Sequence, residues 1–197
     1  HKFLGYFVIA ALIAVYAGSA FAGNYMRWAV FWRGGAGTYG DGNYMELPGA
    51  DGVLGTSDDR NHMFDSNSWD AGVGMPANFL NEHINGAPYN GTLWYMMLTH
   101  AHTDHFNGMN TVLANYVVKY FYETNSTKTG ASASYNTFSG NVNAEAGITR
   151  IGLLIGDYVA TADNTATNGP DWDGGAGLLT VRVCSAITPF DSADVNK

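Results

Sequence analysis

Four side chains that can bind a metal ion fall within six consecutive residues, in the stretch Leu98-Thr-His-Ala-His-Thr-Asp-His-Phe-Asn-Gly108. They are His100, His102, Asp104 and His105, and the three histidines are half of the six in the chain. Neutral imidazole and carboxylate are ligands for Zn²⁺ and also suit Fe and Mn ions. The stretch therefore predicts a metal centre; the alternatives are a chance cluster of surface histidines, or histidines that are hydrogen-bonded in a turn.

The spacing of these residues predicts two neighbouring cation positions. In extended backbone, side chains two residues apart point the same way, so His100 and His102 can reach one cation. After the chain turns, Asp104 and His105 can reach a second one. Two adjacent cations can share an attacking hydroxide, which is the chemistry of a metal-dependent hydrolase.

The histidine-rich stretch is placed between a predicted strand and a predicted helix. Residues 92–98 are a nearly continuous apolar run, typical of a strand buried on both faces of a sheet. Residues 107–116 have the pattern of a helix and residues 117–123 that of the next strand. This unit puts the metal ligands at the carboxyl end of a strand, where α/β sheets usually carry their chemistry.

The remaining elements favour one α/β domain over residues 23–197. Apolar and β-branched patterns predict further strands, and apolar residues at helical spacing predict a short helix over 77–84. The polar stretch 125–149 offers at most a weak helix around Asn143. The further strands are expected at 26–33, 43–47, 60–65, 151–156 and 178–184, with a glycine-rich turn over 34–42.

Composition excludes some classes of protein. With 197 residues, 46% hydrophobic and 13% charged, the chain is long enough and apolar enough for a globular core. A net charge of −8 with nine scattered Lys and Arg residues argues against a strong nucleic-acid-binding patch. The single cysteine, Cys184, can form no internal disulfide and is expected to be a small buried hydrophobe.

Residues 1–22 have the layout of a secretory signal peptide: one lysine, an apolar run and the ending Ala20-Phe21-Ala22. We expect an exported protein that is periplasmic, extracellular or attached to the cell surface, with cleavage after Ala22. The alternative is that the segment is retained as an apolar helix through which copies self-associate. A retained helix favours a second function, that of a structural surface or filament subunit.

A second acidic group lies in the turn-rich segment 48–59. Asp51, Asp58 and Asp59 offer oxygen ligands suited to Ca²⁺, although the segment lacks the ligand alternation and the terminal glutamate of an EF-hand. A solvated hairpin loop is the alternative. A calcium-stabilised binding module is thus a third, weaker hypothesis.

The stretch 98–113 resembles the His-x-His-x-Asp-His signature of the metallo-β-lactamase superfamily, which follows a buried strand. The likeness is strongest to the branch that includes the hydrolase domain of competence proteins. Tyr39-Gly-Asp-Gly-Asn-Tyr-Met45 resembles the Gly-x-Gly-Asp turn of that branch. Arg60-Asn-His-Met-Phe-Asp65-Ser66 resembles its Ile-Asp-Gly-Gly stretch, with Ser66 and Asn67 in place of the glycines.

The resemblance implies an αβ/βα sandwich and one or two zinc ions, with Mn or Fe as alternatives. His100 and His102 would bind the first ion, and Asp104 and His105 the second. Asp104 would also orient the nucleophilic water and act as the general base in hydrolysis of a phosphodiester, ester or amide. Asp65 would support the metal loop from outside the ligand set. The resemblance extends over residues 26–122 and more weakly over the tail 191–197.

The second half of the family's ligand set is where the chain departs from the pattern. Family members add a later bridging aspartate and at least one later histidine, whereas no histidine follows His105 here. Asp157 only superficially resembles the bridging aspartate, because it precedes the stretch that usually comes before that segment. We therefore expect an incomplete sandwich, with the opposite wall on further sequence, on another chain, or lost together with catalysis.

Overall fold

The computed structural model describes residues 26–32, 41–66, 75–124, 132–153, 158–160, 172 and 181–182. Strands and helices alternate through the central part of the chain, so the protein is α/β, as its sequence predicts. The strands are β1 (Arg27–Trp32), β2 (Asp41–Leu47), β3 (Arg60–Phe64), β4 (Thr92–Leu98), β5 (Val117–Thr124), β6 (Thr149–Leu153), β7 (Tyr158–Ala160) and β8 (Val181–Arg182). The helices are α1 (Met75–Ile84), α2 (Thr103–Phe106), α3 (Met109–Asn115) and α4 (Ala133–Ala144).

Strands β1 to β6 form one mixed sheet in the order of the chain. Strand β2 pairs antiparallel with β1 and with β3, whereas the pairs β3–β4, β4–β5 and β5–β6 are parallel. Strands β7 and β8 form a separate antiparallel pair. Because β3, β4 and β5 run the same way, the residues that follow them meet at one edge of the sheet.

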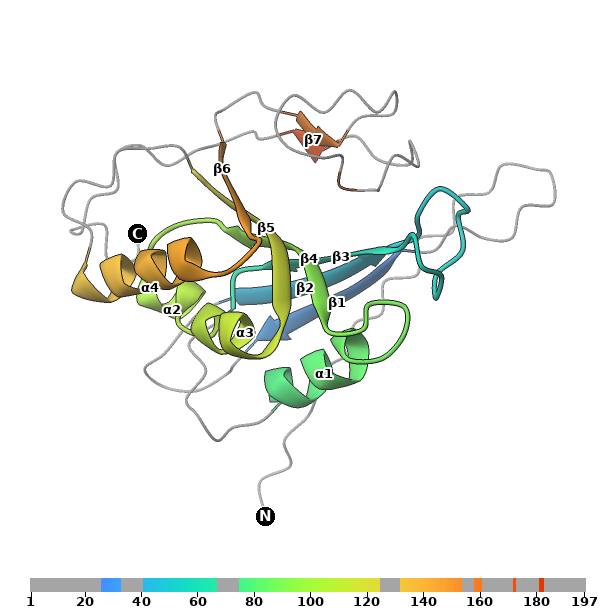
Figure 1. Ribbon diagram of the computed structural model, residues 1–197, viewed down its shortest axis with the longest axis horizontal. Helices are drawn as coiled ribbons and strands as arrows, with labels where there is room; N and C mark the ends of the chain where they lie inside the picture. The colour runs from blue at the N-terminus through green and yellow to red at the C-terminus, as the bar shows by residue number, and fades with distance from the viewer. Residues whose placement is uncertain are drawn as a thin grey trace, which may run out of the picture.

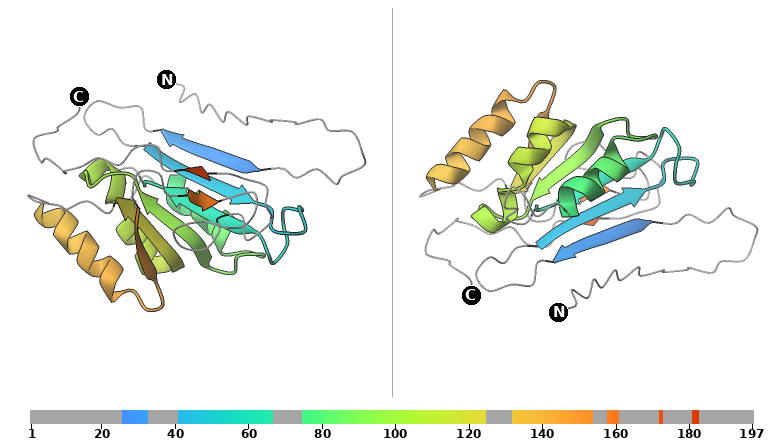
Figure 2. Two further views of the ribbon diagram at one scale, coloured as in Figure 1. Left: turned by 90° about the horizontal axis from the view of Figure 1, so that it is seen from above. Right: turned by 90° about the horizontal axis from the view of Figure 1, so that it is seen from below.

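Helices α1, α3 and α4 lie on one face of the sheet, the lower face in Figure 1, and leave the edge strand β1 uncovered in the view from below (Figure 2, right). Their buried side chains are spaced three or four residues apart, the repeat that forms one apolar helix face. These side chains pack on Leu93, Met96 and Leu98 of β4 and on Val118 and Phe121 of β5. The helix residues in this core include Leu80, Ile84, Met109, Val112, Leu113, Phe138 and Val142.

The opposite face of the sheet carries a second, aromatic cluster. Tyr95 of β4 and Tyr122 of β5 pack there with Trp172, which is 2% exposed. His62 of β3 stacks on Tyr95 with ring centroids 4.5 Å apart, and its Nε2 lies 3.0 Å from the carbonyl oxygen of Trp172. Strand β4 is therefore buried on both faces, as its continuous apolar run predicts.

Helix α4 is the main departure from the predicted elements. The sequence indicates at most a weak helix around Asn143, yet the helix runs from Ala133 to Ala144. The Ser132 hydroxyl caps its first turn by accepting a hydrogen bond from the Tyr135 amide at 3.1 Å. Tyr135, Phe138 and Val142 are buried, and the polar residues between them face outward. The sequence did not predict the full length of this helix because its apolar side chains form only a narrow stripe in a polar stretch.

The start of β2 also differs from the prediction, and several predicted features lie outside the described residues. Strand β2 begins at Asp41, two residues before the strand predicted over 43–47, and residues 34–40 of the predicted turn lie outside the described residues. Residues 1–22, Asp157 and Cys184 lie outside the described residues. In the part of the chain that the structure describes, no helix has the length and apolar character needed to cross a bilayer.

Candidate metal centre

The candidate site lies at the sheet edge where the parallel strands β3 and β4 end. Asp65 follows β3 directly, and Thr99 and His100 follow β4. The Asp65 amide donates to the carbonyl of Met97 at 2.9 Å, which extends the ladder between the two strands by one residue. Asp65 has a φ of 52°, a left-handed conformation that aspartate adopts more readily than most residues.

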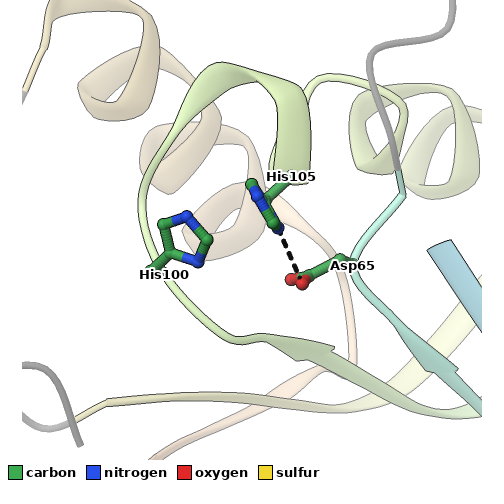
Figure 3. A group of neighbouring side chains, drawn as sticks. All are labelled: Asp65, His100 and His105. Carbon is green, nitrogen blue, oxygen red and sulfur yellow. Dashed lines mark hydrogen bonds and ion pairs between the residues drawn. The ribbon is translucent and has the colours of Figure 1, made fainter. Parts of the chain in front are cut away.

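Asp65 is 4% exposed, and its carboxylate is fully engaged by the end of β4 and by the metal-ligand stretch. Oδ1 accepts from the Thr99 amide at 2.9 Å. Oδ2 accepts from the Thr99 hydroxyl at 2.6 Å and lies 2.8 Å from Nδ1 of His105 (Figure 3). A carboxylate with these donors fixes the ring of His105 and directs its Nε2 away from Asp65.

Ser66 provides a second attachment for the same stretch. Its amide and its hydroxyl both donate to the carbonyl oxygen of His105, at 2.7 and 2.8 Å. Ser66 is fully buried. The serine that replaces an expected glycine therefore adds a hydrogen bond that glycine could not make.

The three histidines lie close together at the sheet edge. The ring centroid of His100 is 3.7 Å from that of His105 and 4.6 Å from that of His102. Asp104 Oδ2 is 3.9 Å from Nε2 of His105. Asp65, His100 and His105 each offer one ligand atom, and these atoms lie within 4.8 Å of one another.

The backbone explains why the ring of His105 lies against that of His100. His102 precedes α2, and the amides of His105 and Phe106 donate to its carbonyl, at 3.0 and 3.3 Å. This short helix turns the chain back, so His105 comes to lie against His100 at the sheet edge (Figure 3). The pairing of His100 with His102 on one cation, and of Asp104 with His105 on another, stays a prediction.

The surroundings of His100 favour its neutral form. Burial and the neighbouring His105 lower the pKa of His100 to about 4, and Asp65 opposes that shift only in part. A histidine with this pKa is neutral at pH 7, which is the form that binds metal ions. His100 thus needs no deprotonation to act as a ligand under neutral conditions.

The acidic loop before β3 brings together the three aspartates predicted as Ca²⁺ ligands. Asp51, Asp58 and Asp59 have carboxylate oxygens within 4.8 Å of one another. Hydrogen bonds of the loop already engage them: Thr56 Oγ1 donates to Asp58 at 2.7 Å, and the Gly55 amide to Asp59 at 2.6 Å. The Thr56 bond and the Asp51 amide lower the pKa of Asp58. The calcium site stays a prediction.

Two polar residues were not identified from the sequence: Thr99, which contacts the site, and Asn61, which joins the two strands that lead to it. Thr99 has a hydroxyl directly before the first histidine, a position that could have marked it as a contact of the metal loop. Asn61 of β3 is fully buried and joins β3 to β4: its Oδ1 accepts from the Trp94 amide at 2.8 Å, and its Nδ2 donates to the Thr92 carbonyl at 3.0 Å. A single asparagine within a strand gives no such signal.

Comparison with known proteins adds no relative: no family model, curated protein or solved structure matches this chain. The assignment of function therefore depends on the geometry of the site and on the histidine-rich pattern.

Proposed function

We propose that this protein is an exported metal-dependent hydrolase with a metallo-β-lactamase-like fold, acting on a phosphodiester, ester or amide. The observation that carries the proposal is the convergence of Asp65, His100 and His105 at the carboxyl edge of parallel strands. The order of β-strands and the burial of β4 on both faces are compatible with the first half of an αβ/βα sandwich.

The donor set fits a zinc ion. His100 and His105 would hold it through imidazole nitrogens, with His102 and Asp104 completing a set of nitrogen and oxygen donors that also suits Mn or Fe. Bound there, the ion would polarise the carbonyl or phosphoryl group of the substrate and make water more acidic. Asp65 holds both His105 and the end of β4, and so fixes the position of these donors.

Asp65, Ser66 and Asp104 would have the remaining roles in the reaction. Asp65 orients His105, and Ser66 fixes the backbone of His105. The side chain of Asp104 is 27% exposed, so its carboxylate can reach both water and the site, and it would accept the proton of the attacking water. Asp65 would therefore act outside the ligand set, whereas Asp104 would both contribute a donor to the ion and accept the proton of the water.

The proposal is tested by the metal content and hydrolytic activity of the purified protein. We expect bound Zn, Mn or Fe, a fall in thermal stability with chelator, and hydrolysis of a chromogenic phosphodiester or ester that His100→Ala abolishes. His83→Ala is the matched control, because His83 lies on α1 and its Nδ1 contacts Glu46. Protein without metal, whose stability chelator leaves unchanged, would overturn the proposal.

The filament hypothesis depends on residues 1–22, which lie outside the described residues. It stays a prediction that the amino terminus of the native protein tests. A mature chain that begins at Gly23 removes its support and agrees with an exported hydrolase.

A further inference from the structure

Thr99 lies between strand β4 and the first histidine, and its hydroxyl contacts two side chains of the candidate metal centre. Oγ1 is 2.6 Å from Oδ2 of Asp65 and 3.0 Å from Nδ1 of His100. The Thr99 amide donates to the other oxygen of Asp65 at 2.9 Å. The hydroxyl is thus held between a carboxylate and an imidazole.

The position of the hydroxyl proton follows from these contacts. A hydroxyl has one proton, so it donates to one of the two neighbours and can only accept from the other. An ionised carboxylate has no proton to donate, and a contact of 2.6 Å has the length of a charge-assisted hydrogen bond from a hydroxyl. Thr99 therefore donates to Asp65. Its oxygen then accepts from His100, which requires a proton on Nδ1 of His100.

We propose that Thr99 is a positioning residue that holds His100 as the Nδ1-protonated tautomer, so that Nε2 carries the lone pair for a metal ion. Asp65 selects the same tautomer of His105 by direct contact with its Nδ1. The Asp65 carboxylate thereby fixes the tautomer of both imidazoles. It acts on His100 through the Thr99 hydroxyl and on His105 by direct contact. The assignment of the tautomer depends on geometry alone, whereas its expected effect on metal binding rests on the proposed function.

Nitrogen NMR of the metal-free protein tests the tautomer. The ¹⁵N shifts of a neutral histidine ring distinguish Nδ1–H from Nε2–H, and the His100 signals are assigned by their loss in His100→Gln. We expect Nδ1–H at His100 in the wild type and in Thr99→Ser, and a loss of this preference in Thr99→Val. An Nε2–H ring in the wild type, or an unchanged ring in Thr99→Val, overturns the inference.

A zinc titration tests the consequence. We expect Thr99→Val to weaken Zn²⁺ binding by about 10- to 100-fold, the usual loss when a partner of a metal ligand is removed, and Thr99→Ser to restore it. Thr111→Val is the matched control, because Thr111 is an exposed residue of α3. Equal affinity of Thr99→Val and wild type, or no rescue by serine, contradicts the role of the hydroxyl. A wild type that binds no Zn²⁺ refutes the proposed function, while the NMR experiment still decides the tautomer.

Discussion

Nδ1 of His105 lies 2.8 Å from Oδ2 of Asp65, forty residues earlier in the chain. The pair joins the end of β3 to helix α2, which follows β4 after a short loop, and the two lie close because β3 and β4 are parallel and adjacent. A histidine whose Nδ1 donates to a carboxylate has a fixed ring and a more basic Nε2. The fold thus holds the ring of His105, a proposed metal ligand, through a carboxylate outside the proposed ligand set.

Asp65→Asn should weaken Zn²⁺ binding by about 10- to 100-fold while the protein still unfolds cooperatively. Asparagine tolerates the left-handed backbone at this position, but its single carbonyl oxygen cannot replace the two oxygens that accept from Thr99 and His105. Competition titration with a zinc indicator measures the loss. Glu82→Gln, an exposed substitution on α1, is the control. An unchanged affinity of Asp65→Asn would show that the carboxylate has no part in metal binding.

Asn61→Ala should lower the free energy of unfolding by about 2 to 4 kcal/mol, because it leaves the Trp94 amide and the Thr92 carbonyl without the side chain that pairs them. Urea denaturation measures the change. Asn85→Ala, at an exposed position, should stay within about 0.5 kcal/mol of the wild type. Similar losses for both variants would contradict a special role for Asn61.

Arg150→Met should destabilise the protein by about 3 kcal/mol, since it removes the cation that pairs with a buried carboxylate. Arg150 Nε donates to Oε1 of Glu123 at 2.7 Å, and Glu123 is 6% exposed. The double variant Arg150→Met/Glu123→Gln should recover part of the loss, because no unpaired charge is then buried. A double variant less stable than the sum of the single changes would refute this explanation.

Tyr135 should make the protein less stable at alkaline pH. Burial raises its pKa above 10.0, as do its hydrogen bond to Glu123 and the charge of that residue. Above pH 10.0 the unfolded chain therefore releases the phenolic proton while the folded protein keeps it, so the free energy of unfolding falls as pH rises. Tyr135→Phe should reduce this slope by up to about 1.4 kcal/mol per pH unit, measured by denaturation at a series of alkaline pH values. An identical slope would contradict the shift.

The sequence predicts the strands and the place of the site better than it predicts the polar contacts. The apolar run 92–98 identifies β4, because a strand buried on both faces is apolar throughout. The histidines that follow it identify the sheet edge, because polar residues begin where the strand ends. Asp65 was found only through resemblance to a family. The contacts of Thr99, Ser66 and Asn61 depend on which strands become neighbours, and no local pattern encodes that.

The contact between the rings of His100 and His105 is a further point that the sequence does not predict. The alternation of His100 and His102 predicts a shared cation if the backbone stays extended. Helix α2 begins directly after His102, however, and brings the ring of His105 nearer to His100. Four residues of helix are too short to give a periodic signal, so tertiary contacts with Asp65 and Ser66 decide their conformation.

The sequential order of β1 to β6 has a consequence for the rate of folding. Each hydrogen-bonded pair of strands in this sheet is also a pair of successive strands along the chain, so the sheet can grow by closing short segments. The contact between His62 and the carbonyl of Trp172 instead closes a loop of 110 residues. Since the entropic cost of closure rises with loop length, the aromatic face should acquire its Trp172 contact after the strands have paired.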